Sequence, residues 1–489
     1  MAPTSTIHAG FMETARRAPE RTALAEGGLL IRYGDLLWRA RRLASLLDRK
    51  CGGSPRPVAV MGDKSHLSVE AILAALITGR PYSVLHPPQR APRLKRMLAD
   101  LRPSLVVDLG SSEPDYDAEA IAGPAPIVRL PCDLPEDAFT PVDNPRGAAY
   151  VLFTSGSTGG PKGVVVSHDA AVLAQQSLIR QVGLSADDVV ASEVAFCFDV
   201  STFDLFGSFS VGAIVVLAGE DVLGDPQALL AHLESRSITW LFTVPTVLRF
   251  LLEAEREAHK RLARLRVGLT GELIPARLAS LMAPMVEDGA RIHNLYGGTE
   301  FPWGLSRRLT AGDMRQPNLL DAVPAGAAVT AEIRETGELL LRGPGLSSGY
   351  LAADTDFSGA FAPLPQFATG DFAESTPDGK YRFLGRRDRQ IRKDGHRIEL
   401  AEIERWIEEH PLVELCYARY DAASNALVAS VSLRPHGGAT KALANIEQHA
   451  RHTLPDYMVP SRISVLPVAP RTSSGKKDYA AVQGRPVQV

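Results

Sequence analysis

Apolar positions along the chain follow two different patterns. Up to about residue 385, short β-branched runs alternate with helical patterns, as in residues 69–79, 148–153 and 213–219. Such alternation is typical of parallel β-sheets joined by crossover helices. Neither a fixed-period repeat nor a low-complexity tract is present, which argues against solenoids and disordered arrays. The first part of the chain is therefore predicted to be an α/β domain.

After residue 389 the pattern becomes that of a smaller α+β unit. Residues 399–410 are predicted to form a helix. One face of this helix would carry the apolar residues Leu400, Ile403, Trp406 and Ile407. A strand at 426–433, a helix near 441–454 and a strand at 462–468 follow. We therefore predict an N-terminal domain over residues 1–385 and a C-terminal domain over residues 389–489. The charged junction has no Pro or Gly after Gly385, which indicates a short hinge.

Length and composition also favour two domains. The 489 residues exceed the roughly 250–300 at which single hydrophobic cores stop growing. Hydrophobic residues make up 45% and charged residues 22%, the balance of a chain that buries a large interior. The formal net charge of −3 gives no basic field for nucleic acid or an anionic membrane, so we expect neither as a partner.

The cysteines and the N-terminus indicate a cytoplasmic protein. The cysteines form neither a CxxC pair nor a ligand-like spacing with histidines, so we expect reduced thiols at Cys51, Cys132, Cys197 and Cys416. The chain does not open on a basic segment followed by an apolar one, and its apolar runs are shorter than the roughly 18 residues that span a bilayer.

Residues 150–168 form the most informative segment. An apolar strand runs into a loop with four hydroxyl side chains and four glycines, and a second strand follows. Glycines let backbone N–H groups approach phosphate oxygens, and Lys162 adds a positive charge, so the loop is predicted to hold a polyphosphate. It is not a Walker loop, because Pro161 precedes the lysine and Gly163 follows it. The alternative is a hairpin turn without a ligand, but a two-residue turn needs far fewer such residues.

The loop resembles that of the adenylate-forming superfamily, which contains acyl-CoA synthetases, luciferases and the adenylation domains of nonribosomal peptide synthetases. Matching segments follow in the family's order at residues 295–300, 337–350, 367–372, 383–404 and 470–479. The resemblance spans nearly the whole chain and is closest to a free-standing amino-acid adenylation domain. It implies ATP and Mg²⁺ as cofactors. It also implies a large N-terminal domain of parallel α/β sheets with a small β-barrel part, and a small mobile α+β C-terminal domain.

The resemblance assigns roles to single residues. Those implied to bind ATP are Thr154, Ser155, Gly156, Ser157, Thr158, Gly159, Lys162, Tyr296, Thr299, Asp371 and Arg386. Those implied to act in catalysis are Thr154, Glu300 and Lys476. Glu300 would hold the metal, which fits the preference of Mg²⁺ for carboxylate oxygen. Asp371 would accept hydrogen bonds from the ribose hydroxyls, and Asp388 would be the hinge.

Each of these assignments has a plainer alternative. Glu300 could be a surface carboxylate, Asp371 part of a polar turn, and residues 383–404 a solvated charge run. Lys476 matches the family's catalytic lysine, which neutralises charge as the nucleophile approaches phosphorus, although a Lys-Lys pair near a terminus is usually exposed. We expect Lys477 to be such an exposed charge.

Residues 196–206 resemble the segment that opens the acyl pocket in amino-acid-activating members. There an aspartate pairs with the α-ammonium of the substrate, and Asp199 takes that place. A carboxylate beside an apolar pocket is costly unless it meets a cation, which favours an amino acid over a fatty or aryl acid. Alternatively, Asp199 caps a helix that begins near Ser201.

The family's pocket positions fall on Asp199, Val200, Phe203, Phe242, Gly268, Thr270, Leu295, Trp303 and Gly304. Three bulky aromatics should leave room only for a small side chain, such as that of alanine, glycine, serine or cysteine. An alternative is that Gly268 and Gly304, which have no side chains, open an additional branch of the pocket. The 13 residues after Lys476 contain no carrier-like serine, so we expect a carrier protein with a phosphopantetheine arm to act in trans.

Two other functions compete with this one. The nearer is an acyl-CoA or acyl-carrier-protein ligase for a carboxylic acid without an amino group, against which Asp199 argues. The other is a catalytically silent nucleotide-binding regulator, against which the joint presence of the predicted catalytic residues argues.

Overall fold

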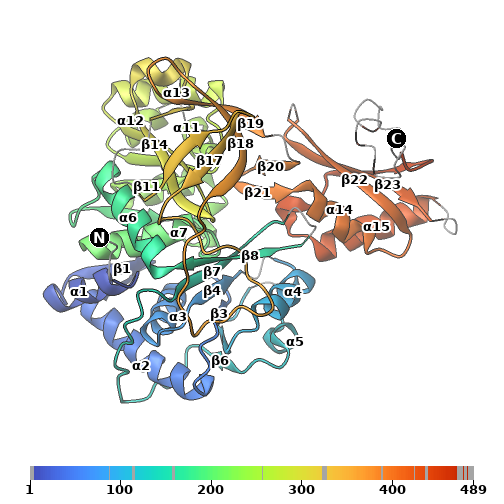
Figure 1. The fold of residues 1–489 in the computed structure, drawn as a ribbon. Helices are drawn as coiled ribbons and strands as arrows, with labels where there is room; N and C mark the ends of the chain where they lie inside the picture. The colour runs from blue at the N-terminus through green and yellow to red at the C-terminus, as the bar shows by residue number, and fades with distance from the viewer. Residues whose placement is uncertain are drawn as a thin grey trace.

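Two mainly parallel β-sheets make up the larger part of the molecule (Figure 1). The computed structural model describes residues 5–86, 89–112, 116–156, 160–255, 257–321, 328–386, 389–422, 424–434, 439–470, 477, 479 and 482. In the eight-stranded sheet only the edge strands run antiparallel to their neighbours. Its strands, in order across the sheet, are β14 (Phe301–Leu309), β13 (Arg291–Gly298), β12 (Arg266–Leu269), β11 (Trp240–Thr243), β9 (Val189–Ser192), β10 (Ile214–Leu217), β1 (Thr22–Glu26) and β2 (Leu29–Arg32).

The six-stranded sheet ends in an antiparallel hairpin. Its strands, in order, are β6 (Ile127–Arg129), β5 (Leu105–Asp108), β3 (Val58–Met61), β4 (Tyr82–Leu85), β7 (Ala148–Thr154) and β8 (Lys162–Ser167). β8 is the only antiparallel member among these described strands, and it pairs with β7. The hairpin of two strands around a glycine-rich loop is the arrangement that the sequence predicts for residues 150–168.

Helices connect and cover the two sheets. They are α1 (Ala9–Arg17), α2 (Tyr33–Cys51), α3 (His66–Ile77), α4 (Ala91–Leu101), α5 (Ala118–Ala122), α6 (His168–Val182), α7 (Val200–Thr202), the π-helix η1 (Phe203–Gly207), α8 (Ser208–Val211), α9 (Glu220–Leu223), α10 (Pro226–Ser235), α11 (Pro245–Ala254), α12 (Ala258–Leu262), α13 (Ala276–Glu287) and the 3-10 helix η2 (Ala311–Arg315). The alternation of strands and helices confirms the predicted α/β class.

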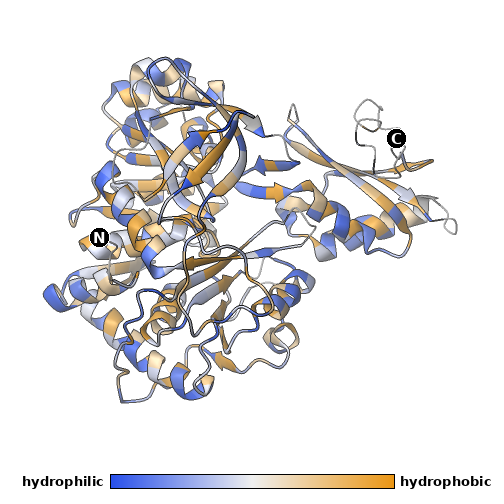
Figure 2. Cartoon of the chain, in the orientation of Figure 1, coloured by the Kyte–Doolittle hydropathy of each residue, from blue (hydrophilic) through white to orange (hydrophobic). Residues whose placement is uncertain are grey.

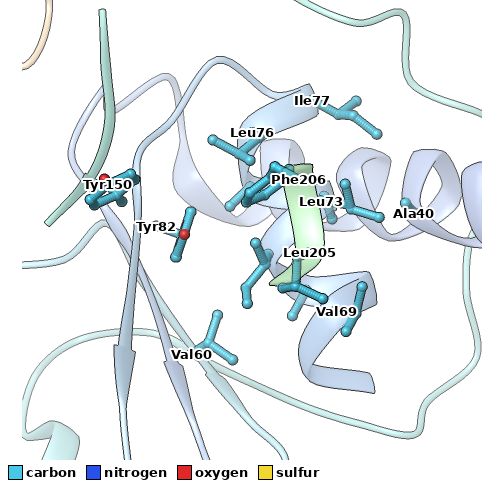
Figure 3. Close-up of a cluster of buried hydrophobic side chains, with 14 of the residues drawn as sticks. Ala40, Val60, Val69, Leu73, Leu76, Ile77, Tyr82, Tyr150, Leu205 and Phe206 are labelled. Atoms are coloured by element: carbon cyan, nitrogen blue, oxygen red, sulfur yellow. The ribbon is translucent and has the colours of Figure 1, made fainter. Parts of the chain in front are cut away.

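Helix α3 is apolar on all sides, so it must be buried on all sides. It begins with a reciprocal capping box between Ser65 and Ser68, and every residue from Ser68 to its end is buried. In Figure 3, the ring of Phe206 from η1 lies between side chains of α3 and Tyr82 of the six-stranded sheet, and Tyr150 lies beyond Tyr82. Helix α3 thus joins the six-stranded sheet to the segment that follows Asp199.

A five-stranded antiparallel sheet follows the two mainly parallel sheets in the N-terminal part. Its strands, in order, are β15 (Leu319–Leu320), β19 (Tyr381–Arg386), β18 (Phe367–Ser375), β17 (Glu338–Arg342) and β16 (Thr330–Ile333). In Figure 2, apolar residues gather in the strands of the N-terminal part, while polar residues are frequent on its outer helices.

The C-terminal part has its own core. Its elements are β20 (Gln390–Lys393), β21 (His396–Glu399), α14 (Leu400–Glu408), β22 (Val413–Asp421), β23 (Ala426–Leu433), α15 (Ala439–Thr453), the 3-10 helix η3 (Asp456–Met458) and β24 (Arg462–Leu466). The predicted apolar face of α14 is buried as expected and packs against β22. The predicted strands and helices of this part are therefore confirmed to within a few residues.

All four cysteines are free thiols, as expected. None of the helices in the described residues combines the length and the apolar character that crossing a membrane requires.

The packing of Phe206 can be tested directly. The Phe206 side chain is 1% exposed, and it lies between α3 and the six-stranded sheet. Phe206→Ala should lower the free energy of unfolding by about 3–5 kcal/mol, because it removes a ring and leaves a cavity. Phe250→Ala is the matched control, since Phe250 is 44% exposed, and it should cost less than about 0.5 kcal/mol. Urea unfolding of the full chain measures both, and similar losses would contradict the packing.

Candidate active site

The phosphate loop connects β7 to β8. Thr154 at the end of β7 lies opposite Lys162 at the start of β8. A Cβ atom at Gly156 would collide with the carbonyl oxygen of Gly160, so the loop folds back on itself only with glycine there. The predicted ligands Ser157, Thr158 and Gly159 lie outside the described residues.

Residues 348–351 cover the outer edge of β8. The Val165 N–H donates to the Gly349 carbonyl at 2.9 Å, and the Ser348 N–H donates to the Val165 carbonyl at 2.8 Å. This pairing brings the Tyr350 ring to the loop, where its centroid lies 5.4 Å from the Lys162 Nζ. The loop is therefore anchored on both sides at its base.

Three predicted nucleotide-binding residues form one cluster. The Tyr296 hydroxyl on β13 donates to Asp371 Oδ2 at 2.6 Å, and Arg386 Nη1 donates to Asp371 Oδ1 at 2.9 Å. Asp371 and Arg386 face each other across β18 and β19, and Tyr296 is held by packing on Phe383. Asp371 is thus an oriented carboxylate with capacity to accept further hydrogen bonds.

Glu300 is a buried carboxylate, with 1% of its surface exposed. The Tyr350 hydroxyl donates to its Oε1 at 2.9 Å, and Arg397 Nη1 donates to its Oε2 at 2.8 Å. Burial alone would raise the pKa of the Glu300 carboxyl, but the charge and hydrogen bond of Arg397 outweigh burial and hold this pKa below its ordinary value. Glu300 is therefore ionised, as a ligand of a divalent cation must be. Within the described ranges, three or more His, Cys, Asp or Glu side chains never gather into a metal-binding group, so a cation here would need oxygens from a nucleotide or water besides Glu300.

The hairpin of β20 and β21 brings the C-terminal part to the site. The Ser155 hydroxyl donates to the Arg397 carbonyl at 2.7 Å, and the Gly395 N–H donates to Glu272. The His396 ring packs edge-on against Phe198, with ring centroids 5.5 Å apart. Sequence reasoning missed these contacts of Arg397, Gly395 and His396. Residues 383–404 contain many basic side chains, but no local pattern in them indicates which partners these side chains contact.

Asp199 has two different partners for its two oxygens. Oδ1 accepts from the Val200 N–H at 2.9 Å, and Oδ2 accepts from the Thr299 hydroxyl at 3.2 Å. The first bond caps a helix that begins at Val200, so the helix-cap alternative is realised at one oxygen. Burial raises the pKa of the Asp199 carboxyl above its ordinary value of 3.8, although the charge of Arg392 and the Thr299 bond oppose the shift.

Most of the predicted pocket residues belong to one buried cluster. Phe203 and Phe242 are fully buried, with ring centroids 4.8 Å apart, and Trp303 lies 5.8 Å from Phe203. Leu295 and Val200 pack in the same cluster. Gly268 lies beneath it, since a Cβ there would be 2.5 Å from Phe242 Cδ1.

Two predicted pocket residues lie beside this cluster. The buried Thr270 is held through a backbone hydrogen bond of 3.0 Å from its N–H to the Thr243 carbonyl. Gly304 borders the Tyr296 backbone, 3.3 Å from where its Cβ would stand. Asp388 and Lys476 lie outside the described residues.

The expectation that Lys477 is exposed is wrong. Its side chain is 19% exposed, and its Nζ lies 3.1 Å from Glu404 and 2.7 Å from Glu408 of α14. It also donates to the Cys416 carbonyl at 2.8 Å. The physical reason is the buried Glu404 carboxylate, which requires nearby cations.

The contact between Gly268 and the rings can be tested by substitution. Gly268→Ala should lower the free energy of unfolding by about 1–3 kcal/mol, because the added methyl group must displace Phe242 or Leu295 in a packed cluster. Gly304→Ala is the matched control and should cost less, since the nearest atom is 3.3 Å from its Cβ position. Thermal and urea unfolding of both variants measure the difference, and a larger loss at Gly304 would contradict the packing.

Comparisons with known proteins identify the family of this chain. The family described as AMP-binding enzyme matches residues 11–351, and that described as AMP-binding enzyme C-terminal domain matches residues 402–476. Malpinin synthetase from Mortierella alpina is 31% identical over 97% of this chain, which spans 6% of that relative's length.

Two solved structures share the fold. The o-succinylbenzoate CoA synthetase of Bacillus subtilis matches with a TM-score of 0.83 at 19% identity, over 98% of both chains. PA1221, a nonribosomal peptide synthetase protein containing adenylation and PCP domains, matches with a TM-score of 0.78 at 21% identity, over 98% of this chain and 84% of that one. The two family matches cover most of the chain, and the chain therefore belongs to the AMP-binding enzymes, the adenylate-forming ligases.

Proposed function

We propose that this ligase activates a small α-amino acid with ATP and then transfers the aminoacyl group to the phosphopantetheine thiol of a separate carrier protein. The observation that carries the proposal is the position of Asp199. One of its oxygens caps a helix, whereas the other has a single hydroxyl donor at 3.2 Å beside an apolar ring cluster. An α-ammonium at that oxygen would give the buried carboxylate the cation that its burial calls for.

The close packing of the assigned pocket residues supports a small substrate side chain. The rings of Phe203, Phe242 and Trp303 are packed against one another, and Gly268 has no free space above it. We assign substrate binding to Asp199, Val200, Phe203, Phe242, Gly268, Thr270, Leu295, Trp303 and Gly304. Glycine, alanine, serine and cysteine are the amino acids that fit this assignment.

In the first half-reaction, a carboxylate oxygen of the amino acid attacks the α-phosphorus. The bond from that phosphorus to the oxygen bridging to the β-phosphate breaks, and pyrophosphate leaves. We assign the phosphates to residues 154–159, Lys162 and Thr299, and the ribose hydroxyls to Asp371, which Tyr296 and Arg386 orient. Glu300 would hold Mg²⁺, which when bound neutralises phosphate charge. Lys476 would stabilise the charge that develops at the α-phosphate.

In the second half-reaction, the thiol sulfur attacks the carbonyl carbon and loses its proton, and AMP leaves as the carbon–oxygen bond breaks. We propose that the chain divides into domains at residues 385–389 and that Asp388 is the hinge on which the C-terminal domain turns between the two steps. The hairpin of β20 and β21 contacts Ser155, Glu272 and Glu300. These contacts support a role for the C-terminal domain at the site in the second half-reaction, besides the role of Lys476 in the first. PA1221, which carries a PCP domain beside its adenylation domain, favours a carrier as acceptor.

The second candidate is an acyl-CoA or acyl-carrier-protein ligase for an acid without an amino group. One observation favours it. The charge of Arg392 acts on Asp199, so the protein itself places a cation near this carboxylate.

Pyrophosphate exchange tests the proposal. With ATP and Mg²⁺, one of the four small amino acids should give the fastest exchange, and the products should be AMP and pyrophosphate. Asp199→Ala should abolish exchange with that amino acid and reduce exchange with its desamino analogue far less, because only the former has an ammonium to lose. Equal losses would favour the second candidate, and release of ADP and orthophosphate would overturn the adenylating reaction itself.

The pH dependence of the same reaction follows from the raised pKa of Asp199. The ionised carboxylate binds the ammonium, so kcat/KM for the amino acid should fall as pH falls through a pKa above 3.8. Asp199→Asn should have a lower kcat/KM but lack this acid limb, since the amide does not titrate there. Exchange rates from pH 4.5 to 8 measure both profiles, and an identical acid limb in the variant would assign the titration to another group.

A further inference from the structure

A buried ion pair between two residues without an assigned role in the site joins the N-terminal and C-terminal parts. Arg93 on α4 contacts Glu402 on α14, and their side chains are 3% and 0% exposed. In Figure 1, α4 lies on the side of the N-terminal part that faces α14 and α15. Neither residue belongs to the nucleotide or acyl sites described above.

The surroundings of this pair make it the buried centre of a larger contact. The Gln89 side chain accepts from Arg93 Nε at 3.3 Å, and an exposed ion pair of 2.6 Å joins Arg90 to Asp456 nearby. Tyr457, next to Asp456, stacks on His396 with ring centroids 3.7 Å apart. The interface between the two parts thus extends from the exposed Arg90–Asp456 pair, through the buried Arg93–Glu402 pair, to His396 on the hairpin of β20 and β21.

The orientation described here does not leave Glu300 ready for a metal. One oxygen of Glu300 is held by Arg397 of the C-terminal part and the other by Tyr350. Metal-bound ATP needs this carboxylate in the first half-reaction, so the orientation fits the second half-reaction. A turn of the C-terminal part about residues 385–389 would break both the Arg397–Glu300 and the Arg93–Glu402 pairs, because each pair joins the C-terminal part to the N-terminal part.

We propose that Arg93 and Glu402 are positioning residues that select the orientation for thioester transfer; this rests on the proposed function. A buried charge that loses its partner is strongly destabilising, whereas the same charge in water loses little. When the C-terminal part has turned away, both side chains can reach water. Removing one partner therefore raises the free energy of the transfer orientation and leaves the adenylation orientation unaffected.

Glu402→Gln tests this, because it removes the charge and keeps the shape. The acid is whichever one gives the fastest pyrophosphate exchange, and the acceptor is 4′-phosphopantetheine. Single-turnover transfer from preformed acyl-AMP should fall roughly 10- to 100-fold. Pyrophosphate exchange should stay the same or rise, which also shows that the variant is folded. The matched control is Arg90→Leu, which removes an exposed pair on the same face and should change transfer less than about twofold.

Rescue separates positioning from general damage. Arg93→Glu should slow transfer as Glu402→Gln does, and the double variant Arg93→Glu/Glu402→Arg should recover most of the transfer rate. Parallel losses of exchange and transfer, or unchanged transfer in both single variants, would overturn the proposal. If no acid with an amino group supports exchange, the amino-acid assignment fails, and the same comparison with the best other acid still decides the role of this pair.

Discussion

A carboxylate buried in the site has to be matched by positive charge, and Glu300 shows how the rest of the molecule meets that requirement. Its place at the turn between β13 and β14 is set by the eight-stranded sheet, while its hydrogen bonds come from Tyr350, which pairs with β8, and from Arg397 on the C-terminal hairpin. Three segments that are distant in the sequence therefore meet at the Glu300 side chain. Because a buried carboxylate is strongly destabilised without positive charge beside it, the Arg397–Glu300 pair contributes to the arrangement of the two parts of the chain seen here.

The need of a buried carboxylate for nearby positive charge also explains the ion pairs of Glu404 in the C-terminal part. Glu404 lies in the buried face of α14, where Arg389 and Lys477 both form ion pairs with it. Lys477 thereby ties the last described segment to the helix that follows the hairpin. The C-terminal part is held together by this group of charges as well as by its apolar core. These internal contacts lie wholly within the C-terminal part and do not involve the N-terminal part.

Local sequence patterns predicted much of the fold, because helices, strands and turns depend on residues that are close together in the chain. The apolar face of α14 and the strand–loop–strand of residues 150–168 depend on spacing and on glycines within one segment. Resemblance placed Tyr296, Asp371 and Arg386, which lie in one cluster. The pairs Arg397–Glu300 and Arg93–Glu402 could not be predicted, since no local pattern indicates which carboxylate an arginine will contact when the two residues lie far apart in the sequence. Lys477 was misjudged for the same reason.

The strip of residues 348–351 along β8 also protects the six-stranded sheet. A bare edge strand offers unpaired N–H and C=O groups to any other extended chain, and such edges start aggregation. Here the backbone groups of Gly163 and Val165 already bond to this strip. A segment that delivers Tyr350 to the site thus also closes a surface on which a second molecule could add a strand. Selection for solubility and selection for catalysis would then act on the same few residues.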